Sequence, residues 1–251
     1  MKVSIITVAK NSGGTIERSI RSVIEQTYKD IEYIIIDGAS TDNTVEIAGR
    51  YKHAVTRLVS EPDTGLYDAM NKGIRLAGGD IVGILNSDDV YYDESVIECV
   101  AAGFSNRETD AVYADLIYVD PENPEKVVRY YRSVGFEPGK FAYGLMPAHP
   151  TFFVRRACYA RYGLFKTDYK IAADFELLAR FIYKQQIRCS YIPRIFVKMM
   201  TGGTSTKNLM SNWILNREIL RACAENGIRT HVLKVLSKYP AKVFQLFDRP
   251  S

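Results

Sequence analysis

Residues 81–89 read Ile81-Val82-Gly83-Ile84-Leu85-Asn86-Ser87-Asp88-Asp89. An aliphatic run that ends in a polar cluster is typical of a buried strand emerging at the edge of a sheet. In open α/β sheets, ligands bind just beyond the carboxyl ends of the strands. Two adjacent carboxylates repel each other unless a cation compensates them, so this cluster is a candidate divalent-metal site. The alternative is a helix N-terminus, in which Ser87 or Asp93 caps the helix that follows.

The first 119 residues alternate strand and helix patterns, as a parallel sheet with crossover helices requires. Strands are predicted at 3–8, 31–36, 55–59, 81–85 and 111–119. The predicted helices cover 16–24, 66–76 and 95–102, with another that Ser40 or Thr41 caps. We therefore expect an α/β protein with helices on a mostly parallel sheet.

Beyond residue 120 the pattern changes. A strand at 126–132 is expected to pair back on 111–119, and residues 133–148 form a connection long enough for an active-site loop. The remaining predictions are a strand at 151–154, a helix at 174–184, strand-like pieces at 190–192 and 195–200, and helices from 209 onward.

Composition excludes some classes of function. The net charge of +4 over 251 residues is too small to indicate nucleic acid as the main ligand. The four cysteines lack the paired spacing of zinc sites, which favours free thiols in a reducing, cytoplasmic setting. The first residues have no room for a signal peptide, and no stretch is apolar enough to span a bilayer. The sequence predicts a soluble or peripheral protein.

Asp37 ends the second predicted strand, beside the end of the first, where Thr7 and Val8 emerge. A carboxylate there can accept a hydrogen bond from a nucleobase N–H or a ribose hydroxyl. It can equally begin the turn at 37–40, which is a common role for Asp.

The helix predicted at 66–76 carries Asp68, Asn71 and Lys72 three and four residues apart, so one face holds all three polar groups. That face could border a diphosphate, with Lys72 supplying positive charge. Alternatively, Asp68 and Lys72 form an ordinary helical ion pair.

Two further candidates lie in the second half of the chain. His149 follows the suspected loop and could contact substrate or be structural. Asp174 begins a helix in an apolar setting, either as a helix cap or as a general base at the mouth of a cleft. The pattern alone leaves both alternatives open.

Four segments together resemble family 2 glycosyltransferases. They read SIITV at 4–8, IIIDGASTD at 34–42, SEPDTGLYDAMNKG at 60–73 and NSDD at 86–89, and the likeness is weaker at 149–150 and 173–176. The resemblance implies a glycosyltransferase-A fold, a nucleotide-sugar donor, Mg²⁺ or Mn²⁺, and inversion at the anomeric carbon. It divides the chain into a catalytic domain (1–208), with nucleotide-sugar-binding (1–119) and acceptor-binding (120–208) halves, and a helical extension (209–251).

Carried over by position, the resemblance implies donor contacts, a metal ligand and a base. The donor contacts are the backbone at Thr7 and Val8 and the side chains of Asp37, Asp68 and Asp88. Asp89 would bind the metal, whose Lewis acidity assists departure of the diphosphate. Asp174 would deprotonate the acceptor hydroxyl from the opposite face.

The chain departs from the family at two places. It has Asp37-Gly38 where many relatives carry Asp-Asp, so base contacts can differ. The Gln-x-x-Arg-Trp-like motif of processive polysaccharide synthases is absent, which favours transfer of one sugar per encounter. The donor is expected to be a UDP-sugar first of all. A glycan or polyprenyl-linked acceptor, in bacterial surface polysaccharide or lipid-linked glycan assembly, is expected from the resemblance.

Two C-terminal segments complete the set of candidates. Thr204 lies in a Gly- and hydroxyl-rich stretch at 202–206 that could close over the donor phosphates or form a turn. The basic, apolar tail from His231 could lie on an anionic membrane or pack on the catalytic domain.

Three other classes of protein fit the sequence less well than a glycosyltransferase. A sugar-phosphate nucleotidyltransferase usually opens with a basic, Gly-rich loop, which residues 10–15 match poorly. A dinucleotide-dependent oxidoreductase lacks support because no G-x-G-x-x-G follows the first strand. A non-catalytic nucleotide-sugar-binding protein on the same fold is a third alternative, because fold does not imply activity. The presence of Asp37, Asp89 and Asp174 together argues against it, and donor hydrolysis in the presence of metal would exclude it.

Overall fold

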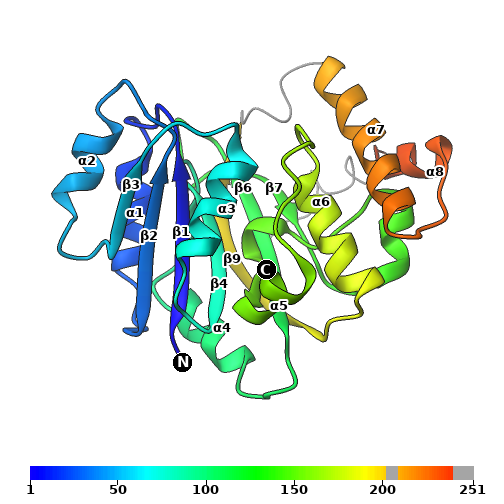
Figure 1. The fold of residues 1–251 in the computed structure, drawn as a ribbon, viewed down its shortest axis with the longest axis horizontal. Coiled ribbons are helices and arrows are strands. Elements are labelled where there is room, and N and C mark those ends of the chain that lie inside the picture. The colour runs from blue at the N-terminus through cyan, green and yellow to red at the C-terminus, as the bar shows by residue number, and fades with distance from the viewer. Residues whose placement is uncertain (202–208, 240–251) are drawn as a thin grey trace.

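The strands of the protein are β1 (Val3–Ala9), β2 (Ile31–Asp37), β3 (Arg57–Ser60), β4 (Ile81–Asn86), β5 (Val90–Tyr91), β6 (Ala111–Val119), β7 (Val127–Tyr131), β8 (Phe153–Arg155) and β9 (Cys189–Met200). The computed structural model describes residues 1–201 and 209–239. Within them the strands form one nine-stranded sheet in the order β3-β2-β1-β4-β8-β6-β9-β5, with β7 paired to β6 (Figure 1).

The helices are α1 (Ile16–Ile24), α2 (Thr44–Arg50), α3 (Leu66–Leu76), α4 (Val96–Gly103), α5 (Arg156–Tyr162), α6 (Ala173–Leu178), α7 (Leu209–Glu225) and α8 (Val232–Leu236). Short 3₁₀ turns lie at Pro138–Tyr143 and His149–Thr151, and α6 continues as a π-helix over Ala179–Lys184.

The strands β3, β2, β1 and β4 run parallel, and β1 lies between β2 and β4. The chain therefore moves away from β1 in one direction to reach β2 and in the other to reach β4. Such a reversal of strand order opens a crevice at the carboxyl ends of the strands, which is where ligands bind in open α/β sheets. This part of the fold places the candidate residues at 37 and 86–89 at one edge.

Alternating side chains build two cores, because successive residues of a strand point to opposite faces of the sheet. Ile6 and Ile34 pack with α3, and Ile5 and Ile35 pack with α1. Figure 1 shows α3 on the near face of the sheet and α1 behind it. Helices on both faces confirm the predicted α/β class.

The second half of the sheet is mixed. The strands β8 and β7 run antiparallel to β6, and β5 runs antiparallel to β9, whereas β9 runs parallel to β6. The expected parallel pairing is found among β1–β4 and again between β6 and β9, whereas β5, β7 and β8 pair antiparallel to their neighbours. The two strand pieces predicted at 190–200 are one strand, since a register shift opposite Tyr113 and Asp115 accommodates Pro193.

The C-terminal helices share the core of the sheet. Ile219 and Cys223 of α7 and Val235 of α8 belong to the same buried cluster as Ile6 of β1 and Phe175 of α6. None of the helices in the described ranges has the length and apolarity of a membrane-spanning segment. The boundary at 208 between catalytic domain and extension remains a prediction.

Candidate active site

The N-terminal candidates meet at the carboxyl end of β1. In the sheet, Ala9 pairs with Asp37 on one side, and Val8 pairs with Asn86 on the other. The Thr7 hydroxyl pairs with the Tyr33 hydroxyl at 3.1 Å inside the core. The side chain of Val8 is also buried. Thr7 and Val8 can therefore offer only backbone groups to a ligand, as the resemblance implied.

Asp37 is fully buried, and its carboxylate is held by the turn that follows β2. It accepts the Ser40 N–H at 2.9 Å and the hydroxyls of Ser40 and Ser60, the latter at 2.6 Å. Ala39 adopts a φ of 55°, a left-handed conformation that is uncommon for residues other than glycine. The turn role of Asp37 is therefore present in the structure, and contact with a nucleobase remains a prediction.

Gly38 explains why this chain departs from an Asp-Asp pattern. A Cβ atom at position 38 would lie 2.2 Å from a carboxylate oxygen of Asp63. The Asp63 side chain, which also accepts the Gly65 N–H at 2.9 Å, thus occupies the space that a side chain at 38 would need. A carboxylate from the loop after β3 therefore lies beside Gly38.

The carboxylates after β4 differ sharply in exposure. Asp88 is exposed, whereas Asp89 is 1% exposed and has one hydrogen-bond donor, the Asn86 amide at 3.2 Å. Burial, and then the charge of Asp88, raise the pKa of Asp89 well above its ordinary value. The buried Oδ1 of Asn86 has no hydrogen-bond partner in the described part of the chain. The fold therefore concentrates oxygen ligands here and leaves their negative charge uncompensated.

The carboxylate and amide oxygens after β4 are suitable ligands for a hard divalent cation. No group of three or more His, Cys, Asp or Glu side chains converges as a metal site among residues 1–201 and 209–239. Mg²⁺ commonly binds through one or two carboxylates together with substrate phosphates, so a full set of protein ligands is not required. Asp89, with Asp88 beside it, would hold such an ion.

The polar residues of α3 do not share one environment. Lys72 contacts the Pro62 carbonyl at 2.7 Å and Glu61 at 2.9 Å, and its distance to Asp68 is 3.9 Å. Asn71 instead points into the protein, where it is 2% exposed and bonds to the backbone of Phe165. The expectation that Asn71 shares the polar face is thus wrong, because α3 buries this position against the loop before α6.

Asp174 and His149 lie near each other on two different elements. Asp174 stands in the first turn of α6, half-buried, and accepts the Phe175 N–H at 2.8 Å. Burial raises the pKa of Asp174, and the charge of His149 opposes this effect. Burial lowers the pKa of His149, and Asp174 opposes it in turn. A carboxylate with raised proton affinity in the first turn of a helix, beside an imidazole, has the character of a general base.

Aromatic side chains connect α3 to His149 and to the loop before Asp174. Phe165 stacks on Tyr67 with ring centroids 5.7 Å apart and meets the His149 ring edge-on at 5.8 Å. The Tyr67 hydroxyl donates to the Ile171 carbonyl, three residues before Asp174. The loop at 165–172 is therefore fixed between α3 and the proposed base.

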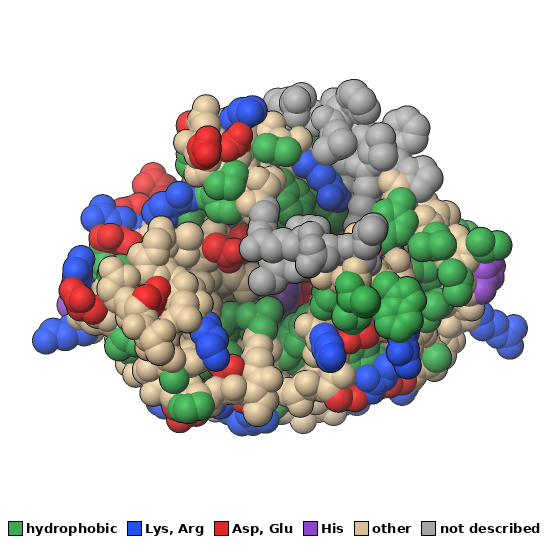
Figure 2. Space-filling view, turned by 90° about the horizontal axis from the view of Figure 1, so that it is seen from above, with side chains coloured by type: hydrophobic (Ala, Val, Ile, Leu, Met, Phe, Trp, Pro, Cys, Tyr) green, Lys and Arg blue, Asp and Glu red, His purple; other side chains and the backbone are tan. Residues whose placement is uncertain are grey.

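Tyr118 of β6 feels the charges of both acidic sites. Burial raises its pKa, the charge of Arg129 opposes this effect, and the charges of Asp89 and Asp174 add to it. The Arg129 guanidinium lies 5.1 Å from the Tyr118 ring centre. Neither residue was predicted from the sequence, since aromatic residues in a strand pattern are typical of core packing. Figure 2 looks down on this edge and shows acidic side chains and a histidine in the hollow at its middle.

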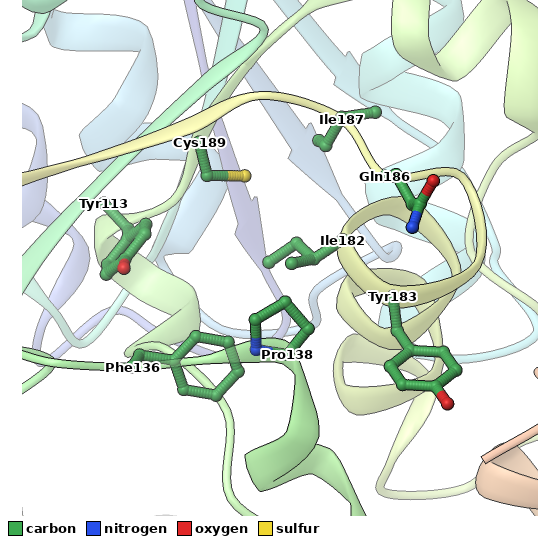
Figure 3. Close-up of a pocket in the computed structure, with 8 residues that line it drawn as sticks. All are labelled: Tyr113, Phe136, Pro138, Ile182, Tyr183, Gln186, Ile187 and Cys189. Atoms are coloured by element: carbon green, nitrogen blue, oxygen red, sulfur yellow. The ribbon is translucent and has the colours of Figure 1, made fainter.

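A separate cavity of about 550 Å³ lies away from these groups (Figure 3). Tyr113, Phe136, Ile182 and Cys189 are among its lining residues, and none of the acidic candidates lines it. Thr204 falls outside the described residues, so its predicted role cannot be placed in the structure.

Sequence comparison gives consistent relatives. The sequence profile of Glycosyl transferase family 2 matches residues 4–162. A PGL/p-HBAD biosynthesis glycosyltransferase of Mycobacterium tuberculosis is 28% identical over 247 residues, covering 94% of this chain and 90% of that protein. An uncharacterized glycosyltransferase of the same species is 32% identical over 181 residues, covering 71% of this chain and 68% of that protein.

Solved structures share the fold. TarS residues 1–349 from S. aureus, in complex with UDP-GlcNAc, superpose with a TM-score of 0.70 at 20% identity, covering 97% of this chain and 73% of that one. This chain spans 44% of the longer TarS structure. The mannosyltransferase PcManGT from Pyrobaculum calidifontis, in complex with GDP-Man and Mn²⁺, superposes with a TM-score of 0.66 at 21% identity. The match covers 89% of this chain and 63% of that one. The expected fold is confirmed.

Proposed function

This chain belongs to glycosyl transferase family 2, and we propose that it moves one sugar from a nucleotide-diphosphate-sugar to an acceptor hydroxyl, with inversion and with a divalent metal. One observation supports the proposal best: Asp89 follows the end of β4, Asp174 stands in the first turn of α6, and the charges of both act on Tyr118 of β6. In this proposal, a metal–diphosphate site at Asp89 and a proton acceptor at Asp174 serve one bound sugar.

Asp174 is the proposed base. As the acceptor oxygen bonds to the anomeric carbon, its proton passes to the Asp174 carboxylate. The bond from that carbon to the diphosphate oxygen breaks, and the nucleoside diphosphate keeps the electron pair. The raised pKa of Asp174 favours uptake of the proton. His149 borders the same space, and burial lowers the pKa of its imidazole.

The donor lies, in this proposal, at the carboxyl ends of β1, β2 and β4. Asp37 and the backbone at Thr7 and Val8 face the nucleobase, Asp68 and Lys72 border the pocket, and Asp88 meets the ribose or sugar. Mn²⁺ or Mg²⁺ on Asp89 would supply Lewis acidity to the leaving diphosphate. Lys72 acts by holding the loop at 61–62, since its ammonium already contacts that loop.

The relatives support the choice of donor class. TarS is solved with UDP-GlcNAc and PcManGT with GDP-Man and Mn²⁺. We take a UDP-sugar as the first donor to test, and a glycan or polyprenyl-linked molecule as the acceptor. Transfer of one sugar per encounter is proposed because the motif of processive synthases is absent from the sequence.

A peripheral position at the cytoplasmic face of a membrane is part of the proposal. In α8, Leu233 is 75% exposed and Val232 54%, beside Lys234. Apolar side chains among cations suit an anionic bilayer surface. The remainder of the tail, 240–251, lies outside the described residues. Co-sedimentation with anionic vesicles should fall for Leu233→Asp, and equal sedimentation of both proteins would oppose membrane contact.

Calorimetric titration with UDP-, GDP- and dTDP-sugars, with and without Mn²⁺, tests the proposed donor site. We expect metal-dependent binding of one of them and its loss in Asp89→Ala. The absence of binding to every nucleotide sugar would contradict the proposal.

A further inference from the structure

The loop that precedes Asp174 is held by one buried carboxylate of α7. Glu218 is 9% exposed. It accepts three consecutive backbone N–H groups, from Lys170 at 2.7 Å and from Ile171 and Ala172 at 2.9 Å each. Ala172 is the N-cap residue of α6, which begins at Ala173, and Asp174 stands in its first turn. Glu218 therefore fixes the backbone immediately before the proposed base.

Other residues on the same face of α7 hold the loop differently. Arg221 pairs with Asp168, and Glu225 contacts Lys166 at 2.6 Å and the Tyr169 hydroxyl at 2.9 Å. These contacts join side chains that are partly exposed and lie farther from Asp174 along the chain. Arg221 also reaches the Asp168 carbonyl, at 3.4 Å, but of these three α7 residues only Glu218 bonds to the backbone at 170–172.

Burying a carboxylate costs desolvation free energy, which a residue that only fixed the loop would not need to lose. The described residues give Glu218 no cationic partner, so the three amide dipoles compensate its charge. A neutral side chain could fill the space without desolvating a charge. The charge also reaches the site, because Glu218 is among the groups that act on Asp174 and on Tyr67.

We propose that Glu218 is a positioning residue for glycosyl transfer, which orients the Asp174 carboxylate through the backbone at 170–172 and places a fixed negative charge behind it. This inference rests on the proposed function, in which Asp174 is the base. It adds a residue of the C-terminal helical region to the machinery of the site.

The charge has a predictable effect on the pH profile. In the described part of the chain, the titratable groups that interact electrostatically with Asp174 are His149, Glu218, Tyr67, Tyr118 and Tyr131. The charge of Glu218 raises the pKa of Asp174, and that of His149 lowers it. Because the base must be deprotonated, activity rises with pH through the pKa of Asp174. Removing the charge of Glu218 should therefore move the acidic limb of the profile to lower pH.

Three variants separate geometry from charge: Glu218→Gln, Glu218→Asp and, as a matched control on the same helix face, Glu225→Gln. The rate of nucleoside diphosphate release would be measured against pH with the full chain, its preferred nucleotide sugar and Mn²⁺. Glu218→Gln should lower kcat by about 10²-fold, as expected for a misplaced catalytic group, and shift the acidic limb to lower pH. Glu218→Asp, shorter but charged, should lower kcat and leave the limb in place. Glu225→Gln should leave the limb in place.

The results distinguish the inference from the proposed function. If the wild type releases no nucleotide, or Asp174→Asn releases it as fast as the wild type, the proposed function fails. If Asp174→Asn is inactive while Glu218→Gln keeps the wild-type rate or the wild-type acidic limb, only the inference fails. Circular dichroism would verify that each variant is folded. Should Glu218→Gln not fold, a Glu218→Asp protein with unchanged kcat would overturn the positioning role.

Discussion

Replacing Asp174 by asparagine should separate turnover from donor binding. Asparagine keeps an oxygen that can accept the Phe175 N–H, which lies 2.8 Å away in the wild type, so the start of α6 is preserved. It cannot take the acceptor's proton. A positioned base contributes about 10²–10⁴-fold. At about 1.36 kcal/mol for each factor of ten, that is about 2.7–5.5 kcal/mol of transition-state stabilisation. Turnover should fall by this factor, with donor affinity unchanged.

The same substitution should stabilise the fold. Because the folded protein raises the pKa of Asp174 above its unfolded value, holding the ionised carboxylate costs stability at neutral and alkaline pH. The melting temperature of Asp174→Asn should exceed that of the wild type there. The difference should shrink as the pH falls through the raised pKa, where the native carboxyl becomes protonated.

Nucleotide release, donor titration calorimetry and thermal unfolding at several pH values measure the three effects. Retained turnover in Asp174→Asn would refute the role of Asp174 as the general base. Joint loss of turnover and donor binding would show that Asp174 shapes the donor pocket instead. A lower melting temperature at neutral pH would refute the electrostatic reasoning.

Three further substitutions test other parts of the structure. Asp89→Asn should raise the melting temperature without metal, because it removes a buried charge, and should abolish the shift that Mn²⁺ produces in the wild type; an undiminished Mn²⁺ shift would exclude this residue as a ligand. Asn71→Ala leaves the backbone N–H and C=O of Phe165 without their partner, so the free energy of unfolding measured in urea should fall by about 1–3 kcal/mol. A smaller decrease would show that these two hydrogen bonds contribute little to stability. Gly83→Ala would put a Cβ atom 2.2 Å from the buried Phe153 ring and should cost about 1–3 kcal/mol; unchanged stability would mean that the ring shifts freely.

The N-terminal half could be predicted because short-range patterns determine it. The helix at 66–76 has the predicted bounds, and the strands at 3–9, 31–37 and 81–86 extend each prediction by a residue or so. The helix α2 begins at Thr44 with Asn43 as its N-cap residue, so neither Ser40 nor Thr41 caps it as predicted. The Ser40 side chain bonds to Asp37 instead. A capping residue with a competing tertiary partner cannot be recognised from local sequence.

Long-range contacts explain what the sequence did not disclose. The strand β5 and the helix α5 were not predicted, since two residues carry no periodicity and 156–162 lack a capping signal. Asp88 and Asp89 are identical residues next to each other in the sequence. Whether each is exposed or buried depends on how β4 ends against neighbouring elements, which the sequence does not reveal. Tyr118 and Glu218 act on Asp174 from elements far apart in the chain, so only the structure brings them together.

The central claim is that metal-dependent donor binding and proton removal belong to different carboxylates of one site. The most direct test measures Mn²⁺-dependent binding of the preferred nucleotide sugar and release of its nucleoside diphosphate for the wild type, Asp89→Ala and Asp174→Asn. We expect the wild type to do both, Asp89→Ala to do neither, and Asp174→Asn to bind without turnover. Turnover by Asp174→Asn at the wild-type rate, or undiminished metal-dependent binding by Asp89→Ala, would contradict the account.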